Sequence, residues 1–258
     1  MNMPAPLAAT RWQRNVARSF GRAAPRYLAL SGAQQHMGEA LWQHLPRSAT
    51  SILDLGCGPG HWTTRLATHY RTSALGLDLA PGMLAEAQRR CAGRGHWLCA
   101  DAARLPLADA SHDLVFSNLA LQWCPDLAQV FAELHRVLAP GATALINTLA
   151  PGTLAEVAEA WSRPQALLDF LSAEQVAASS HAAGFSVHIE QVAERFHYPD
   201  LAAVMASIKG VGAQQPPPAG QAPLTRSDLM RARQRYERLR EPAGLPVTYQ
   251  RLTLILQR

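Results

Sequence analysis

The sequence of 258 residues lacks most features that mark membrane, secreted or metal-binding proteins. No run approaches the ~18 consecutive apolar residues of a membrane-spanning helix, and residues 1–9 lack the basic-then-apolar order of a signal peptide. The four cysteines have no metal-ligand spacing, and no two of the ten histidines stand at zinc spacing. We therefore expect a cytoplasmic protein with reduced thiols, no metal and no membrane association. A hydrophobic share of 48% supports a full core within one structural domain.

Acidic residues are also in deficit, with 19 Asp and Glu against 24 Lys and Arg and a net charge of +5. An excess of this kind weakly favours an acidic partner or substrate. Near the N-terminus, arginines recur at three- and four-residue steps, while Trp12, Val16 and Phe20 recur on the other side. The pattern predicts a helix that ends near Pro25, with one buried face and one arginine face. The arginine face comprises Arg11, Arg14, Arg18, Arg22 and Arg26.

A second basic helix is predicted near the C-terminus. Thr225 and Asp228 form a candidate capping box at its start. An apolar stripe follows at helical spacing, and three arginines share another face. A single helix of this kind is usually only solvated, but two that flank a substrate pocket favour docking of an acidic macromolecule. The stripe is Leu229, Ala232, Tyr236 and Leu239, and the arginines are Arg231, Arg235 and Arg238.

The stretch Ile52 to Gly60 is the most informative part of the chain. Its first residues predict a buried parallel strand, and residues 61–70 carry helical spacing, so a turn rich in glycine joins a strand to a helix. Glycine permits backbone angles closed to other residues and lets a ligand approach the main chain. Strand, glycine turn and helix form a nucleotide-type arrangement. The glycines are Gly56, Gly58 and Gly60.

Further strands end in polar residues in the order that such a fold requires. Residues 73–79 predict a second strand ending at Asp78, whose carboxylate can accept both ribose hydroxyls of a nucleotide. A third strand ends at Asp101, a fourth at Asn118, and residues 142–149 supply a fifth. Because carboxyl ends of parallel strands share one edge of the sheet, these side chains should converge.

The glycine spacing G-x-G-x-G, with Asp54 two residues before the first glycine, resembles the first motif of class I S-adenosylmethionine methyltransferases. A carboxylate there suits a sulfonium and an ammonium, and it would repel a pyrophosphate. The resemblance implies that Asp101 bonds the adenine amino group and that Ala102 lends a backbone N–H. It implies a Rossmann-like α/β fold with a seven-stranded, mostly parallel sheet whose last strand is antiparallel.

A long segment separates the last two predicted strands. The sixth strand candidate covers residues 185–190 and the last covers 247–256, with about 50 residues after residue 198. A connection of this length favours a functional lid over the substrate side, at about residues 199–241, with the loop 214–223 as its mobile edge. A dimerisation element is the alternative. The expected organisation is an N-terminal helical segment (1–47), a cofactor-binding core (48–150), and the rest of the sheet with the lid (151–258).

Several more selective motifs are similar to those of malonyl-acyl-carrier-protein O-methyltransferases, the enzymes that start the pimeloyl part of biotin. They are residues 20–24 with Tyr27, the Leu-Gln-Trp at 121–123, the Ser-Ile-Lys-Gly-Val-Gly-Ala at 207–213, the Leu-Thr-Arg at 224–226, and the Leu-Pro-Val-Thr-Tyr at 245–249. The resemblance runs from about Phe20 to the C-terminus. Gln214 and Gln215 depart from it, because an asparagine or histidine often follows the lid Gly-Ala.

The resemblance implies methyl transfer to the free carboxylate of malonyl, held as a thioester on a carrier protein. That carboxylate is ionised at neutral pH, with a reference pKa near 4. No acid or base residue is therefore required, and the sequence offers no convincing His/Asp dyad. The predicted cofactor site comprises Asp54, Gly56, Gly58, Gly60, Asp78, Leu79, Met83, Asp101, Ala102 and Asn118. The predicted substrate-positioning residues are Tyr27, Gln122, Trp123, Lys209 and Arg22.

Other functions fit the sequence less well. Amino-methylating DNA enzymes carry a proline-rich motif after strand four, which Ser117 to Ala120 lack, and Cys124-Pro125 reverses the Pro-Cys order of cytosine-C5 enzymes. We therefore expect no nucleic-acid partner. Methyltransferases of free carboxylic acids or quinones share the same core and are the main alternative. A non-catalytic S-adenosylmethionine-binding protein would need a damaged site, but every motif glycine and acid is present.

Overall fold

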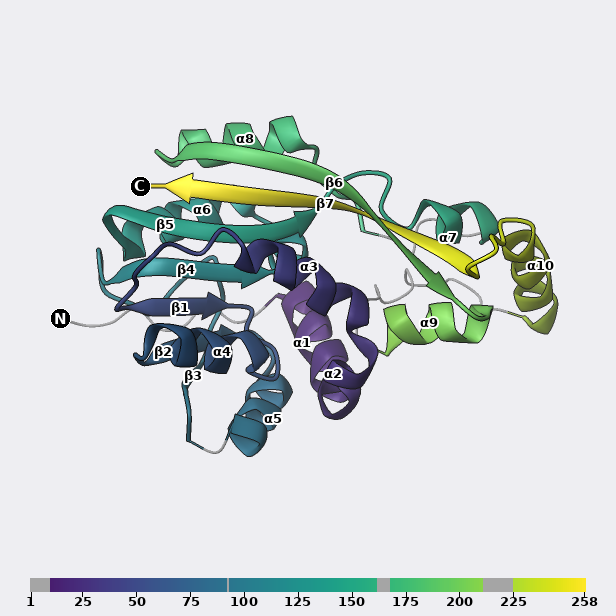
Figure 1. The fold of residues 1–258 in the computed structure, drawn as a ribbon, viewed down its shortest axis with the longest axis horizontal. Coiled ribbons are helices and arrows are strands. Elements are labelled where there is room, and N and C mark those ends of the chain that lie inside the picture. The colour runs from purple at the N-terminus through teal and green to yellow at the C-terminus, as the bar shows by residue number, and fades with distance from the viewer. Residues whose placement is uncertain (1–9, 92, 162–167, 211–224) are drawn as a thin grey trace.

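The computed structural model describes residues 10–91, 93–161, 168–210 and 225–258. Its centre is a seven-stranded sheet in the order β3-β2-β1-β4-β5-β7-β6, with helices on both sides (Figure 1). The described strands are β1 (Ile52–Leu55), β2 (Ala74–Asp78), β3 (His96–Cys99), β4 (His112–Asn118), β5 (Leu138–Leu149), β6 (Ser186–Tyr198) and β7 (Leu245–Gln257). The helices are α1 (Arg11–Ala23), α2 (Tyr27–Leu30), α3 (Gly32–Trp42), α4 (His61–Tyr70), α5 (Pro81–Cys91), α6 (Leu127–Val137), α7 (Ala155–Ala160), α8 (Ala173–Ala182), α9 (Leu201–Lys209) and α10 (Arg226–Glu237), with 3-10 turns at Ala24–Arg26 and Leu121–Trp123.

The first five strands run parallel, and β7 is antiparallel to both of its neighbours. Strand β1 and the middle of β4 are buried without alternation because helices cover both of their faces. Leu53, Val115 and Phe116 are fully buried there. This arrangement confirms the predicted α/β fold with an antiparallel last strand.

Strand β6 is longer than the sequence predicted. Its thirteen residues all pair with β7, from Ser186 opposite Gln257 to Tyr198 opposite Leu245. The apolar pattern fades after Ile189, because most of the following residues face solvent on at least one side. Backbone hydrogen bonds to β7 hold these later residues in the strand, and the side-chain pattern does not reveal them. The two strands therefore leave the sheet as a long antiparallel ribbon (Figure 1).

Helices α7, α9 and α10 gather around the far end of this ribbon (Figure 1). They share a second apolar core with α3, in which Met37, Val204, Tyr236 and Val247 are fully buried. The hydroxyl of Tyr236 donates to the carbonyl of Pro246 at 2.8 Å, so its one polar atom is satisfied. Helices α9 and α10, which lie between β6 and β7 in the sequence, therefore share a core with the N-terminal helix α3.

Both predicted basic helices are present. Thr10 caps α1 with a capping box, and the helix ends before a 3-10 turn that contains Pro25. Its four arginines and Arg26 in that turn are all exposed, while Val16 is buried. Thr225 and Asp228 form the predicted capping box of α10. The predicted apolar stripe of α10 was wrong at one position, since Leu229 is 52% exposed and only the later residues of the stripe reach the core.

Helix α1 lies against α5 at a very close approach. A Cβ built on Gly82 would meet the Cα of Gly21 at 2.7 Å, so any side chain there would force the helices apart. This contact brings α1 over the ends of the first strands. Among the described residues, no helix is long and apolar enough to cross a membrane. The predicted loop at 214–223 and part of the lid motif lie outside the described residues.

Candidate cofactor site

The glycine turn between β1 and α4 has an unusual backbone. Gly56, Gly58 and Gly60 have φ angles of 74°, 53° and 82°, a region that side chains rarely adopt. Added Cβ atoms at Gly56 and Gly60 would collide with Ala120 and with the ring of Trp97. A Cβ at Gly58 would meet no atom within 4 Å. The backbone at Gly58 therefore borders open space, as a ligand-binding turn requires.

That open space is a pocket between the glycine turn, the carboxyl ends of β2 and β4, and helix α1. Its empty volume, which includes space open to solvent, is about 780 Å³. We call it the main pocket. Its lining includes ten of the predicted site residues, namely Tyr27, Gly56, Gly58, Asp78, Leu79, Met83, Asp101, Ala102, Asn118 and Trp123.

Asp78 is held firmly at the end of β2. Its two carboxylate oxygens accept the backbone N–H groups of Gly58 at 2.9 Å and Ala80 at 2.8 Å. Burial raises the pKa of this carboxyl, and the two backbone hydrogen bonds oppose that shift. A carboxylate has about four acceptor positions, so capacity for ligand hydroxyl groups remains.

Asp101 lies at the opposite wall of the main pocket. It accepts the backbone N–H of Ala103 at 3.0 Å, and the side-chain amide of Gln13 from α1 donates to it at 2.5 Å. Gln13 was not among the predicted site residues, because nothing in the sequence of α1 indicates that its polar positions reach Asp101. Helix α1 thus closes over the pocket through a direct bond to a predicted ligand group.

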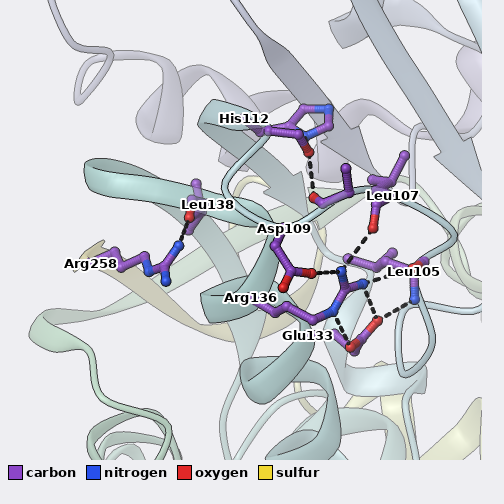
Figure 2. A network of polar contacts seen from close by, with 10 residues as sticks. Leu105, Leu107, Asp109, His112, Glu133, Arg136, Leu138 and Arg258 are labelled. Carbon is purple, nitrogen blue, oxygen red and sulfur yellow. Dashed lines mark hydrogen bonds and ion pairs between the residues drawn. The ribbon is translucent and has the colours of Figure 1, made fainter.

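The loop that follows Asp101 is fixed by a single arginine. Figure 2 shows the guanidinium of Arg136, from α6, surrounded by acceptors. It donates to the carbonyls of Leu105 and Leu107 at 2.8 Å each, to Asp109 at 2.6 Å, and to both oxygens of Glu133 at 2.8 and 2.9 Å. Glu133 in turn accepts the backbone N–H of Leu105 at 2.6 Å. This network holds the wall that carries Asp101 in one conformation.

Tyr27 and Trp123 also line the main pocket. Burial and the nearby carboxylate of Asp78 both raise the pKa of Tyr27, so its hydroxyl is neutral. Trp123 stacks on Trp12 with a centroid distance of 6.4 Å and meets Phe20 edge-on at 5.1 Å. The indole N–H of Trp12 donates to the carbonyl of Trp123 at 3.0 Å. Aromatic contacts therefore anchor α1 to the loop after β4.

Two further pockets adjoin the main one. The outer pocket, with an empty volume of about 810 Å³, shares Trp123 and Cys124 with the main pocket and also contains Gln122 and Thr148. Burial raises the pKa of Cys124 to about 12, so this thiol is not a nucleophile at neutral pH. The glycine-turn pocket, of about 350 Å³, shares Gly56, Gly58, Tyr27 and Asn118 with the main pocket and extends to α3.

Five predicted site residues do not line the main pocket. Asp54 is only 1% exposed and accepts the hydroxyl of Thr63 at 2.5 Å, so its carboxyl faces α4 beneath the turn. Gly60 lies against Trp97, and Gln122 lines the outer pocket, where its amide donates to the carbonyl of Leu119 at 2.8 Å. The remaining two, Arg22 and Lys209, are exposed on α1 and at the end of α9.

The residues present fit S-adenosylmethionine. Gly58 leaves a cradle that a Cβ would fill, and Asp78 and Asp101 line the same pocket. The side-chain oxygen of Gln34, in the glycine-turn pocket, is buried and has no hydrogen-bond partner among the described residues. Within the part of the chain that the structure describes, no group of three His, Cys, Asp or Glu side chains is arranged to hold a metal ion.

The fold and the site define a class I, S-adenosylmethionine-dependent methyltransferase. Residues 53–146 match the family model described as a methyltransferase domain. The phosphoethanolamine N-methyltransferase 2 of Haemonchus contortus, solved with S-adenosyl-L-methionine, has the same fold, with a TM-score of 0.64 at 18% identity over 100% of this chain and 62% of that one.

The sequence relatives narrow the assignment. A malonyl-acyl-carrier-protein O-methyltransferase of Methylovorus sp. (strain MP688) is 37% identical over 91% of this chain and 85% of its own length. The biotin biosynthesis bifunctional protein BioHC of Cellvibrio japonicus (strain Ueda107) is 36% identical over 95% of this chain, which spans about half of that protein's length. The chain belongs to the malonyl-acyl-carrier-protein O-methyltransferase family.

Proposed function

We propose that this protein transfers a methyl group from S-adenosylmethionine to the free carboxylate of a malonyl thioester on acyl carrier protein, in the synthesis of the biotin precursor. The observation that carries the proposal is the family relationship, which extends over 91% of the chain and therefore includes the substrate side as well as the cofactor core. The main pocket with an adjoining outer pocket supports it, because a transferase needs two neighbouring sites.

We assign the adenosyl part of the cofactor to the main pocket. Asp78 accepts the ribose hydroxyls, Asp101 accepts the adenine amino group, and the N–H of Ala102 bonds the ring. Leu79 and Met83 pack on the adenine faces; both line the pocket, and Met83 is only 1% exposed. When bound, the cofactor supplies an electrophilic methyl group on a sulfonium.

The outer pocket is the proposed site of the malonyl group. Trp123 borders both pockets, and the polar side chains of the outer pocket include Gln122, Thr148 and Asp169. The hydroxyl of Thr148 lies 3.5 Å from the side-chain oxygen of Gln122. A malonyl carboxylate needs no deprotonation at neutral pH. The protein's contribution is therefore alignment, which supplies about 7–11 kcal/mol in favourable cases, and exclusion of water around charges that neutralise in the transition state.

Helices α9 and α10 form the proposed lid over this side. A Cβ on Gly210, at the end of α9, would collide with the side chain of Leu30 in α2, so α9 ends directly on the N-terminal helices next to Tyr27. Lys209 precedes this contact and is the single lysine of the sequence. We propose Lys209 and Arg22 as the cations that orient the malonyl group on closure.

Acyl carrier protein is the proposed macromolecular partner. The exposed arginines of α1 and of α10 provide two basic surfaces, to which an acidic carrier would be steered. Association through exposed charges of this kind should weaken as salt is added.

Mass spectrometry of malonyl-loaded carrier protein, incubated with the enzyme and S-adenosylmethionine, tests the proposal. We expect a gain of one methyl group that mild ester hydrolysis removes, and no gain on acetyl-loaded carrier. No gain on malonyl-loaded carrier, from protein that binds S-adenosylmethionine, would reject this substrate. A free carboxylic acid or a quinone would then be the substrate to assay.

A further inference from the structure

Gln34 presents a buried acceptor that the protein itself leaves unused. It lies in the first turn of α3, and its side-chain oxygen Oε1 is buried without a hydrogen-bond partner in the described part of the chain. An unpaired buried polar group of this kind is costly and is uncommon in native proteins. The side chain lines the glycine-turn pocket together with Gly56 and Gly58.

The backbone around Gln34 is held in place by two strand-end asparagines. Asn118, at the end of β4, donates to the carbonyl of Gln34 at 2.9 Å, and Asn147 of β5 donates to the carbonyl of Met37 at 2.7 Å. Asn147 also donates to the side-chain oxygen of Asn118 at 3.0 Å, and Thr253 donates to Asn147 at 2.7 Å. The acceptor is thus presented by a helix that is fixed directly to the sheet.

This network gives Asn118 a role in addition to the predicted contact with the cofactor. Its amide nitrogen is bonded to Gln34 and its amide oxygen to Asn147. Both ends of the side chain are therefore engaged within the protein. Asn118 borders the pocket and also positions the backbone of Gln34.

The glycine-turn pocket continues the main pocket along the backbone of Gly56 and Gly58. An adenosyl ligand that places its ribose at Asp78 directs its other end into this continuation. In S-adenosylmethionine that end carries an ammonium, which has three donors and no acceptor. The one imidazole in this pocket, His61, has a pKa lowered by burial and by Arg65, so it remains neutral near pH 7 and does not repel a cation.

We propose that Gln34 Oε1 accepts a hydrogen bond from the α-ammonium of S-adenosylmethionine, a contact that rests on the proposed function. The sequence suggested Asp54 for this cation, but the carboxyl of Asp54 lies outside the lining of both pockets and bonds Thr63. A neutral amide oxygen from a neighbouring helix therefore supplies the acceptor, and it distinguishes the intact cofactor from adenosyl compounds without an amino-acid end.

The test compares two ligands that differ in that end. S-adenosylhomocysteine carries the ammonium, whereas 5′-methylthioadenosine does not. For Gln34→Leu we expect the calorimetric Kd of S-adenosylhomocysteine to rise about tenfold to a hundredfold, as for loss of one hydrogen bond to a charged group. The Kd of 5′-methylthioadenosine should change by less than about twofold. Gln34→Glu should keep tight binding of S-adenosylhomocysteine, because a carboxylate also accepts from an ammonium.

Gln43→Leu, an exposed change at the end of the same helix, is the matched control and should alter neither affinity. Thermal unfolding of each variant verifies the fold; leucine is a good helix former, so Gln34→Leu should fold. Unchanged binding of S-adenosylhomocysteine to Gln34→Leu, or an equal loss for both ligands, would overturn the assignment. A wild-type protein that binds neither ligand would instead overturn the proposed function itself.

Discussion

Replacement of Gly58 with valine separates the ligand-binding role of the glycine turn from its role in folding. The backbone at Gly58 has a φ of 53°, which costs an L-residue about 1–2 kcal/mol and somewhat more when it is β-branched. No protein atom lies within 4 Å of the added Cβ, so a clash of that atom with the protein does not add to this cost. The expected loss in free energy of unfolding is therefore about 2 kcal/mol.

The effect on cofactor binding should be much larger. The new side chain would occupy the space where the main and glycine-turn pockets meet, and the ligand must pass through that space. We expect the Kd of S-adenosylhomocysteine to rise by at least about a hundredfold, equivalent to ~2.7 kcal/mol. Calorimetric titration measures the affinity, and urea unfolding measures the stability.

Gly141→Val provides the matched control. Gly141 has a φ of 78°, is exposed, and likewise has no atom within 4 Å of an added Cβ, but it lies at the amino end of β5, away from the pockets. Its stability loss should resemble that of Gly58→Val, with unchanged affinity. Binding by Gly58→Val within about threefold of wild type would refute the reasoning, because the pocket junction would then tolerate a side chain.

Three further predictions follow from charged groups. Burial raises the pKa of Asp54 to about 7. The folded state therefore keeps a proton that the unfolded state loses above about pH 4. The free energy of unfolding should fall between pH 4 and pH 7, by about 4 kcal/mol relative to the Asp54→Asn variant. Urea unfolding of both proteins across this pH range measures the difference, and parallel pH profiles of the two unfolding free energies would refute the prediction. Arg136→Met should lower the free energy of unfolding by about 2 kcal/mol through the loss of its loop contacts. Arg89→Met should have little effect, because the Arg89 side chain is exposed on α5 and Arg90 also pairs with its partner Glu86; equal losses would contradict this. Arg18→Glu should raise the KM for malonyl-loaded carrier several-fold at low salt and leave the KM for malonyl-coenzyme A unchanged. The exposed control Arg47→Glu should change neither KM.

Much of the fold was predictable because its signals are local. The buried strands of a parallel sheet appear as short apolar runs, and the acids that end β2 and β3 follow those runs directly. The topology confirms the order of strands that these elements imply. The second half of β6 was missed because main-chain pairing with β7, which no side-chain pattern records, holds it in the sheet. Helix α3 carries Gly38 against the ring of Trp62, and its weak periodicity gave no clear signal.

The sequence by itself determined the residues that the turn and strand ends must contribute. Gly58, Asp78 and Asp101 follow from backbone angles and strand order, which depend on neighbours along the chain. Only the tertiary structure decided which other groups meet them. Gln13 and Gln34 reach the pockets from helices that precede the sheet, and Asp54 turns toward α4. The physical reason is that a side chain's partners depend on how helices pack across the sheet edge, and that packing is settled by contacts between residues distant in the chain.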